Sequence, residues 1–482
     1  MSSITFFSDL AENPTPLPHF WEHTVGSDHA TVALRADWQE QLKRCHDELG
    51  FRYVRFHGLL SDDMGTVVRE NNKLLYSFFN SDQIFDFLLS IGMKPFVELS
   101  FMPKALASGK KTVFSYEANV TPPGDYRQWS TLISRIVSHW VQRYGLQEVR
   151  QWFFEVWNEP NLKSFWTGTR DDYFKLYRYT ATAIKKVDAS LLVGGPATAK
   201  SEWIEEFVEF CEQRKVPVDF LSTHQYPNDG FEDEDDTEIQ LFKSQRGIMR
   251  EGAQNTRRRA RGKLVYYTEW NTSSNSRDPL HDEPYASAFA VATILEARGL
   301  VEGYSFWTFS DIFEENYFPS VPFHGGFGLL NLHGIPKPTH RAFELLHHVG
   351  TEQYLVDGLH ATVDCSVIRK DSSVTVLLTN HATPGHSIKT ERIEIRLDNV
   401  PQPGSAYIQR IDSEHANPKA LWLEMGQPEY LIEPEVVRLD EASRLVKERQ
   451  PISYQDGAVF VEIDLPPHAV GAITIEFAIG DE

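Results

Sequence analysis

The chain has 482 residues, of which 41% are hydrophobic and 12% aromatic, and its formal net charge is −21. This length accommodates a closed α/β barrel of ordinary size with one further domain, and the composition is that of a well-packed soluble protein. A field of this sign repels nucleic acid and anionic membrane surfaces, so neither is an expected partner.

Cysteine usage and the start of the chain indicate where the protein works. Cys45, Cys211 and Cys365 stand far apart without metal-ligand spacing, so we expect no disulfide framework and no metal site. Residues 1–18 lack the basic start and continuous apolar run of a signal peptide. No apolar stretch reaches the roughly 18 residues that a membrane span requires. We therefore expect a reduced, cytoplasmic protein, although removal of a leader would leave the same sequence.

Strand and helix patterns alternate along residues 21–349. The expected strands are short apolar or β-branched runs at residues 21–26, 53–57, 94–99, 152–156, 191–194, 218–224, 264–270 and 303–309. Amphipathic helical patterns separate them, and eight such units close naturally into a (β/α)8 TIM barrel. A doubly wound open sheet is the alternative, and the lack of a Gly-rich phosphate loop after an early strand disfavours it.

Beyond residue 350 the pattern changes to short alternating runs separated by turn residues. These runs lie at residues 362–369, 374–379, 392–397, 406–411, 458–463 and 472–477. They favour a β-sandwich, and residues 420–446 are helical or irregular. We expect a catalytic barrel at residues 16–349 and an accessory β-sandwich domain at residues 350–482, with segment 1–15 as a candidate to complete the sandwich.

The strongest functional signal is a carboxylate at the end of a buried strand. Pro160 cannot donate to a sheet, so the strand before it must stop beside Glu159. Glu269 ends a later strand in the same way. By our count these are strands four and seven, which lie across the mouth of a barrel. Two facing carboxylates are what glycosidic bond cleavage requires, one protonated to serve the leaving oxygen and one ionised to attack or to activate water.

Four stretches carry a family resemblance: residues 53–58 (YVRFHG), 95–103 (PFVELSFMP), 154–162 (FEVWNEPNL) and 268–271 (TEWN). They resemble glycoside hydrolase family 39, in the clan of retaining barrel glycosidases. The resemblance implies that Glu159 is the general acid/base and Glu269 the nucleophile, about 5–5.5 Å apart. It also implies that Asn158 binds the sugar 2-hydroxyl, that His224 lines the sugar site and that Tyr226 touches the nucleophile. We attribute the raised pKa that the acid needs to the charge of Glu269.

Other strand ends supply further candidates. We expect Arg55 to pair with Glu269 and His57 to bind a sugar hydroxyl. By the resemblance, Trp307 is the floor under the sugar and Glu314 accepts from a sugar hydroxyl. The candidate cleft walls, for which plain core packing is the alternative, are Phe114, Phe165 and Trp166.

The sugar is inferred from what surrounds these candidates. Family 39 is best known for β-xylosidases and α-L-iduronidases, and iduronidases place lysine where this chain has Tyr226. The loop after Glu314 is aromatic and Gly-rich, without a cationic cluster for a uronate. Its members are Tyr317, Phe318, Phe323, Gly325, Gly326 and Phe327. Xylose lacks the C6 group, and bulky aromatic side chains would fill that space.

We therefore expect an exo-acting retaining β-xylosidase that needs no cofactor and acts on small xylo-oligosaccharides. The alternatives are an α-L-arabinosidase, β-galactosidase, β-glucosidase or α-L-iduronidase of the same family, or a catalytically silent sugar-binding protein. The sequence leaves the oligomeric state open, with a homo-oligomer as one candidate.

Overall fold

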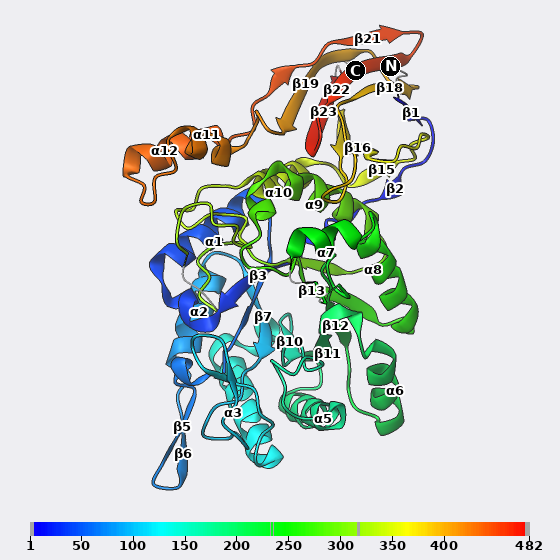
Figure 1. Cartoon of the computed structure of the whole chain (residues 1–482). Helices are drawn as coiled ribbons and strands as arrows, with labels where there is room; N and C mark the ends of the chain where they lie inside the picture. Colours follow the sequence, from blue (N-terminus) through cyan, green and yellow to red (C-terminus); the bar gives the residue numbers. More distant parts are fainter. Residues whose placement is uncertain (1–3, 232, 235, 316–318, 478–482) are drawn as a thin grey trace.

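The computed structural model describes residues 4–231, 233–234, 236–315 and 319–477, so Tyr317 and Phe318 of the predicted aromatic loop lie outside the described residues. Eight parallel strands close into a barrel (Figure 1). They are β3 (Thr24–His29), β4 (Tyr53–His57), β7 (Lys94–Leu99), β10 (Phe153–Val156), β11 (Leu192–Thr198), β12 (Phe220–His224), β13 (Leu264–Trp270) and β14 (Gly303–Phe306). The predicted TIM barrel is confirmed, and the open-sheet alternative is wrong.

Helices surround the barrel and bury their apolar faces against it. They are α1 (Ala36–Leu49), α2 (Phe79–Ser90), α3 (Tyr126–Tyr144), α4 (Leu146–Val149), α5 (Arg170–Val187), α6 (Ile204–Arg214), α7 (Thr237–Lys243), α8 (Ile248–Arg259), α9 (Pro284–Glu296) and α10 (Pro338–His348). In α1, for example, Trp38, Leu42, Cys45 and Leu49 are buried at the spacing of one helical face. The helices thus exclude water from the outside of the strands and leave the strand ends to build a site.

The barrel interior is layered because alternate residues of each strand face inward. The layer nearest the amino-terminal ends of the strands is aromatic. Its members are Phe96, Phe153, Phe220 and Tyr266, with Tyr53 packed against them. Two residues further along their strands come Arg55, Glu98 and Glu155, whose side chains are 0% exposed. A charged layer therefore lies on an apolar one.

Two further sheets lie beyond the barrel, and both chain termini lie with them (Figure 1). One has the order β1-β18-β22-β21 and the other β2-β15-β16-β17-β23-β19-β20. Their strands are β1 (Ile4–Asp9), β2 (Thr15–Pro16), β15 (Glu352–Tyr354), β16 (Val363–Lys370), β17 (Ser373–Asn380), β18 (Glu391–Asp398), β19 (Pro403–Ile411), β20 (Glu448–Arg449), β21 (Ile452–Gln455), β22 (Ala458–Leu465) and β23 (Ala469–Phe477). Apolar side chains from both sheets form one buried cluster.

The N-terminal strand joins this cluster across almost the whole sequence. β1 pairs in parallel with β18, from Ile4 opposite Ile393 to Asp9 opposite Asp398. Helices α11 (Pro418–Glu424) and α12 (Glu433–Ala442) occupy the segment predicted to be helical or irregular, and they project to one side (Figure 1).

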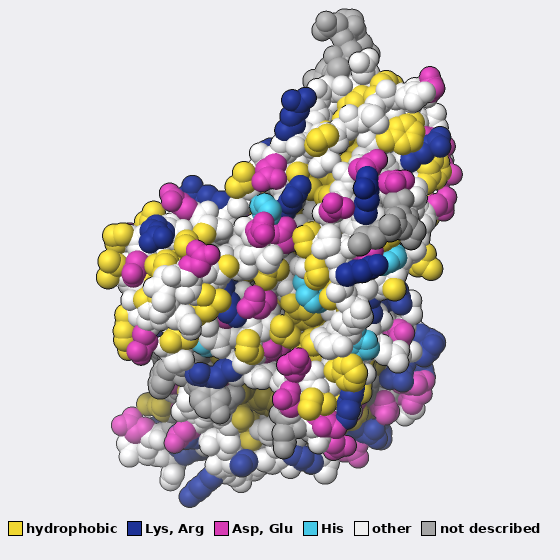
Figure 2. Space-filling view, turned by 45° about the horizontal axis from the view of Figure 1, so that its top comes forward, with side chains coloured by type: hydrophobic (Ala, Val, Ile, Leu, Met, Phe, Trp, Pro, Cys, Tyr) yellow, Lys and Arg dark blue, Asp and Glu magenta, His cyan; other side chains and the backbone are white. Residues whose placement is uncertain are grey.

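The surface carries both signs of charge. Lys and Arg are interspersed with Asp and Glu over the face shown in Figure 2. Among the residues described, none of the helices combines the length and the apolar character that crossing a membrane requires.

Phe6 provides a test of how firmly the N-terminal strand is held. Its side chain is buried in the cluster shared by the two sheets, whereas Phe7 lies on the opposite face with Arg396 over its ring. We expect Phe6→Ala to lower the free energy of unfolding by about 3–5 kcal/mol. The control Phe7→Ala should cost less than about 1 kcal/mol in the same urea titration. Equal losses would contradict the different burial of the two rings.

Candidate active site

A pocket of about 260 Å³ opens at the carboxyl-terminal ends of the barrel strands. The predicted residues that line it are His57, Phe114, Asn158, Glu159, Phe165, Tyr226, Glu269 and Trp307. Phe327 of the predicted aromatic loop lines it as well. Residues that were not predicted also line it, namely Leu162, Ala199, Lys200, Asp229, Ser274, Ser276, Phe313 and Glu315. Arg55 and His224 are 0% exposed and bond to the lining carboxylates from behind. The structure therefore brings most of the predicted residues together.

Glu159 reaches the pocket from the loop after β10. Trp157 and Glu159 have φ values of 75° and 43°, so the chain turns sharply out of the strand. The Glu159 N–H then donates to the Ala197 carbonyl at 2.8 Å. Burial raises the pKa of Glu159 to about 7, and the Glu98 charge adds to the rise. Burial, rather than the charge of Glu269 expected from the sequence, is thus the main cause.

Glu269 faces the pocket because β13 is irregular. Against β12, Thr223 pairs with Tyr267 and His224 pairs with Glu269, so Thr268 is an extra residue. Such a bulge re-aims the side chains on either side of it. The Tyr226 hydroxyl donates to Glu269 Oε2 at 3.1 Å, which is the contact that the resemblance implies.

Arg55 links the charged groups beneath the pocket. Its Nη1 donates to Glu269 Oε1 at 2.8 Å, as the sequence predicts, and its Nε donates to Glu155 Oε2 at 2.6 Å. Its Nη2 lies 2.8 Å from Glu98 Oε2 and donates to Asn158 Oδ1 at 2.9 Å. Because guanidinium is only a donor, it must face the Asn158 oxygen. The amide nitrogen of Asn158 is therefore directed away from Arg55.

His224 connects Glu159 to the barrel interior. Its Nδ1 lies 2.9 Å from Glu159 Oε1, and its Nε2 lies 3.1 Å from Thr268 Oγ1. The Thr268 hydroxyl donates its one proton to Glu155 Oε1 at 2.9 Å. The Thr268 oxygen must therefore accept from His224, which places the imidazole proton on Nε2.

This tautomer leaves a lone pair on Nδ1 of His224, to which the carboxyl of Glu159 can donate its proton. Burial lowers the pKa of His224 to about 4, so the imidazole is neutral near pH 7. The chain from Glu155 through Thr268 and His224 therefore stabilises the protonated form of Glu159, the form that a general acid needs.

His57 lies between the buried carboxyl groups of Glu98 and Glu315. Its Nδ1 lies 2.6 Å from Glu98 Oε2, and its Nε2 lies 3.5 Å from Glu315 Oε1. Burial opposes the charged form of His57, but the Glu98 carboxylate outweighs it and the pKa of His57 is raised. Burial also raises the pKa of Glu315 well above its ordinary range. Glu315 thus places at the pocket wall a carboxyl whose burial opposes ionisation.

Two predicted residues lie elsewhere. The Glu314 carboxylate is bonded to Arg35 Nη1 at 2.5 Å on the surface, and its neighbour Glu315 lines the pocket instead. The structure thus places Glu315, the next residue, where the sequence analysis expected Glu314. Trp166 is fully buried behind the wall, with its ring 5.0 Å from that of Trp157 and its Nε1 donating to the Thr169 carbonyl. It supports the wall rather than lining it.

One end of the pocket is aromatic. Its side chains, Tyr226, Trp307, Phe313 and Phe327, form one buried cluster. The loop that carries Phe327 is tied down by a buried lysine, because Lys337 Nζ donates to the Gly326 carbonyl at 2.8 Å. Asp282 and Asp311 lie 2.6 and 2.7 Å from this ammonium and neutralise it. The position of the Phe327 ring is therefore set by a charged anchor outside the pocket.

The separation of the two glutamates is the decisive geometry. One carboxylate oxygen each of Glu159 and Glu269, and one ring nitrogen of His224, lie within 4.8 Å of one another. Retaining glycosidases hold their two carboxyl groups about 5–5.5 Å apart, whereas inverting enzymes hold them about 6.5–9.5 Å apart. An approach of the nearest oxygens to within 4.8 Å is compatible with the retaining spacing and favours it over the inverting one. These three side chains are also the donors that a metal ion would meet here, although the adjacent Arg55 cation opposes one.

Comparison with known proteins agrees with this geometry. The model of the family described as "Glycosyl hydrolases family 39" matches residues 8–459. The chain belongs to glycosyl hydrolase family 39. It is 50% identical over 466 residues to a β-xylosidase of Caldicellulosiruptor saccharolyticus, with 95% of each chain covered. A β-xylosidase of Geobacillus stearothermophilus is 38% identical over 480 residues, covering 95% of this chain and 92% of that one.

A solved family 39 structure gives the same result in three dimensions. The β-xylosidase from Caulobacter crescentus superposes with a TM-score of 0.83 at 33% identity, covering 98% of this chain and 99% of that chain. The family resemblance predicted from the four sequence stretches is confirmed.

Three of the residues that were not predicted for this family 39 site show which signals the sequence does and does not contain. Glu155 alternates with Phe154 and Val156, and strand alternation could have placed it inside the barrel, level with Arg55. Thr268 had no such signal, because its inward direction depends on the bulge in β13. Glu315 could not be chosen over Glu314, since adjacent loop residues have no fixed direction.

Thr268→Val tests the chain of hydrogen bonds that protonates Glu159. Without the Thr268 oxygen, His224 can carry its proton on Nδ1 and donate to ionised Glu159, which lowers the pKa of Glu159. A net hydrogen bond is worth about 1 kcal/mol, so the basic limb of kcat/KM against pH should move about one unit lower. The measurement is a pH–rate profile with an aryl glycoside.

The matched control for this substitution is Thr223→Val. Thr223 is equally buried in the neighbouring strand, but its hydroxyl donates to the Thr198 carbonyl. We expect its basic limb to coincide with that of the unmodified enzyme. A Thr268→Val profile that also coincides would contradict the assigned tautomer.

Proposed function

We propose that this chain is a retaining, exo-acting β-xylosidase that releases β-linked xylose from small xylo-oligosaccharides. The observation that carries the proposal is the pair Glu159 and Glu269, whose oxygens approach within 4.8 Å at the barrel mouth. The high identity to named β-xylosidases over most of the chain supports the same sugar.

The first half of the reaction uses the two glutamates in different protonation states. Glu159 gives its proton to the glycosidic oxygen while that oxygen's bond to the anomeric carbon breaks. The Glu269 carboxylate attacks the anomeric carbon from the opposite face and forms an ester. Tyr226 and Arg55 orient Glu269 for this attack, and the Asn158 amide nitrogen is the donor placed for the sugar 2-hydroxyl.

The second half regenerates the enzyme. Glu159, now a carboxylate, takes a proton from water as the water oxygen attacks the anomeric carbon. The ester bond to Glu269 breaks, and Glu269 leaves as a carboxylate. Two inversions at one carbon give net retention, and Glu159 is protonated again for the next cycle.

Specificity for a pentose is supported by the aromatic end of the pocket. Tyr226, Trp307, Phe313 and Phe327 fill space there with rings, and a C6 hydroxymethyl or carboxylate would have to compete with them. A uronate would bring a charge against apolar rings, at a desolvation cost that nothing in this cluster offsets. This arrangement favours xylose over iduronate. A silent sugar-binding protein is disfavoured because both glutamates and their supporting side chains are in place.

We propose in addition that the two outer sheets form an accessory β-sandwich domain, residues 350–482 with segment 1–15, on a barrel of residues 16–349. The cluster that the sheets share and the pairing of β1 with β18 support this division. The expected partner is the oligosaccharide alone, with no nucleic acid or membrane, in the cytoplasm. The projecting α11–α12 segment carries exposed apolar side chains that suit a homo-oligomer: Leu423, Tyr430, Ile432 and Val437.

Trapping with an activated 2-fluoro xyloside tests the mechanism directly. The fluorine slows hydrolysis of the ester, so we expect one equivalent of added sugar mass on the peptide that contains Glu269. A Glu269→Gln variant should remain unlabelled. An unlabelled wild-type peptide would refute the covalent mechanism.

A panel of aryl glycosides tests the sugar separately. Weak turnover of the β-xyloside relative to the other glycosides would refute the assignment of xylose as the substrate sugar.

Phe327→Ala tests the origin of sugar specificity. Removing this ring opens space at the aromatic end of the pocket for the C6 group of a hexose. One extra methylene in a substrate typically changes the kcat/KM ratio of two substrates by about 10–200-fold. We expect the ratio of kcat/KM for β-xyloside over β-glucoside to fall about tenfold or more. Phe323→Ala is the control, because Phe323 lies in the same loop but packs against Trp422. An unchanged ratio in Phe327→Ala would exclude this ring as the determinant.

A further inference from the structure

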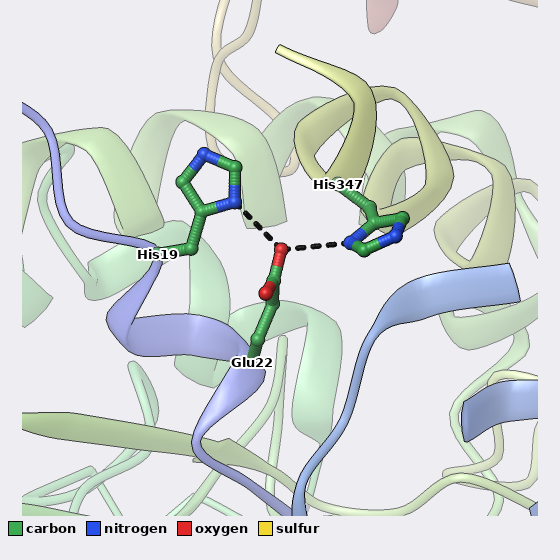
Figure 3. A group of neighbouring side chains, drawn as sticks. All are labelled: His19, Glu22 and His347. Atoms are coloured by element: carbon green, nitrogen blue, oxygen red, sulfur yellow. Dashed lines mark hydrogen bonds and ion pairs between the residues drawn. The ribbon is translucent and has the colours of Figure 1, made fainter. Parts of the chain in front are cut away.

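Two histidines and a glutamate meet at the amino-terminal end of the barrel, the end opposite to the pocket (Figure 3). His19 and Glu22 belong to the segment that leads into β3, and His347 lies in the last turn of α10. Glu22 Oε1 lies 2.7 Å from His19 Nδ1 and 2.9 Å from His347 Nδ1. Figure 3 shows the two imidazoles turned toward this one oxygen from different elements.

The proton positions in this group leave two acceptors facing one another. His19 Nε2 lies 3.1 Å from the Gly350 carbonyl oxygen, which can only accept, so Nε2 carries a hydrogen. In neutral His19 the Nδ1 atom then carries a lone pair and no hydrogen. It faces an oxygen of the Glu22 carboxylate, which also has only lone pairs. Two acceptors 2.7 Å apart need a hydrogen or a metal ion between them: a second proton on His19, a proton on the Glu22 carboxyl, or a metal ion.

The backbone nearby leaves room for the second imidazole. Gly50 has a φ of +74°, and a Cβ atom there would lie 2.6 Å from His347 Nδ1. The glycine therefore permits both the local turn and the approach of His347 to Glu22. The donor atoms of His19, Glu22 and His347 consequently lie within 4.8 Å of one another.

We propose that His19 Nδ1, the Glu22 carboxylate and His347 Nδ1 bind a divalent transition-metal ion, of which zinc fits best. Two imidazole nitrogens and one carboxylate form a donor set that zinc accepts, with ligand distances of about 2.0–2.2 Å. The carbonyl of Gly350 holds the His19 tautomer that a metal needs, as outer carbonyls commonly do at histidine ligands. The three side chains are 14–31% exposed, which leaves room for water as a fourth ligand.

The ion would join segments that are distant in sequence. His19 follows the strand β2 that pairs with β15, and Gly350 stands just before β15. A bound ion would therefore fix the segment that leads into β3 to the end of α10, where the chain leaves the barrel for the outer sheets. Stabilisation is the expected role, because the amino-terminal face of such barrels serves stability and catalysis lies at the other face.

The test is a zinc titration of the full chain after dialysis against a chelator. Isothermal calorimetry with zinc chloride should show one equivalent bound, and zinc should raise the melting temperature by about 2–4 °C. His347→Ala should abolish both effects and leave β-xyloside turnover at 25 °C unchanged. The matched control is His348→Ala, which removes the adjacent imidazole outside the group and should bind zinc like the unmodified enzyme.

The active site supplies the competing outcome, because the Glu159, His224 and Glu269 donors are also close together. Zinc bound there would inhibit turnover, and that inhibition would persist in His347→Ala. Calorimetric binding that persists undiminished in His347→Ala, or no binding at all, would overturn the proposal and assign a proton, rather than a metal ion, to the space between His19 and Glu22. Binding that disappears only in His347→Ala would support it.

Discussion

Arg55 is the group on which the rest of the site depends. Its guanidinium is fully buried, and burial alone opposes its charge, yet the carboxylates of Glu155, Glu98 and Glu269 raise its pKa further. A buried cation is tolerable only when it is paired and hydrogen-bonded, and each of those carboxylates would be equally costly without Arg55. His57 adds a second contact to Glu98, and that carboxylate raises the pKa of the imidazole against the effect of burial. The interior of the barrel is thus a set of charges that can only be buried together.

This shared burial explains how two glutamates at one mouth come to have different environments. Glu269 receives hydrogen bonds from Arg55 and Tyr226, which orient its carboxylate. Glu159 has no hydrogen bond from Arg55 and faces a neutral His224, and burial raises its pKa to about 7. Opposite environments within a few ångströms separate acid from nucleophile, as at other paired carboxylate sites.

The sequence predicted what depends on strand order and alternation. Eight strand patterns gave the barrel, and the position of Pro160 after the fourth strand located Glu159. Arg55 and Glu269 were expected to pair because both lie near strand ends at one mouth. What could not be predicted depends on local departures from regularity. The inward turn of Thr268 needs a bulge, and the choice between Glu314 and Glu315 depends on a loop whose direction is set by the contact of Glu314 with Arg35.

The layered interior also separates stability from chemistry. The aromatic layer begins directly above the amino-terminal end, where the His23 ring stacks on Tyr53 at 4.7 Å. This buried layer lies on the amino-terminal side of the charged layer around Arg55 and excludes water from that part of the barrel interior. A change of charge at the His19–Glu22–His347 group, whether a proton or a metal ion causes it, must therefore act through the packing of helix and strand ends. It can alter how tightly the barrel closes without altering the protonation of Glu159.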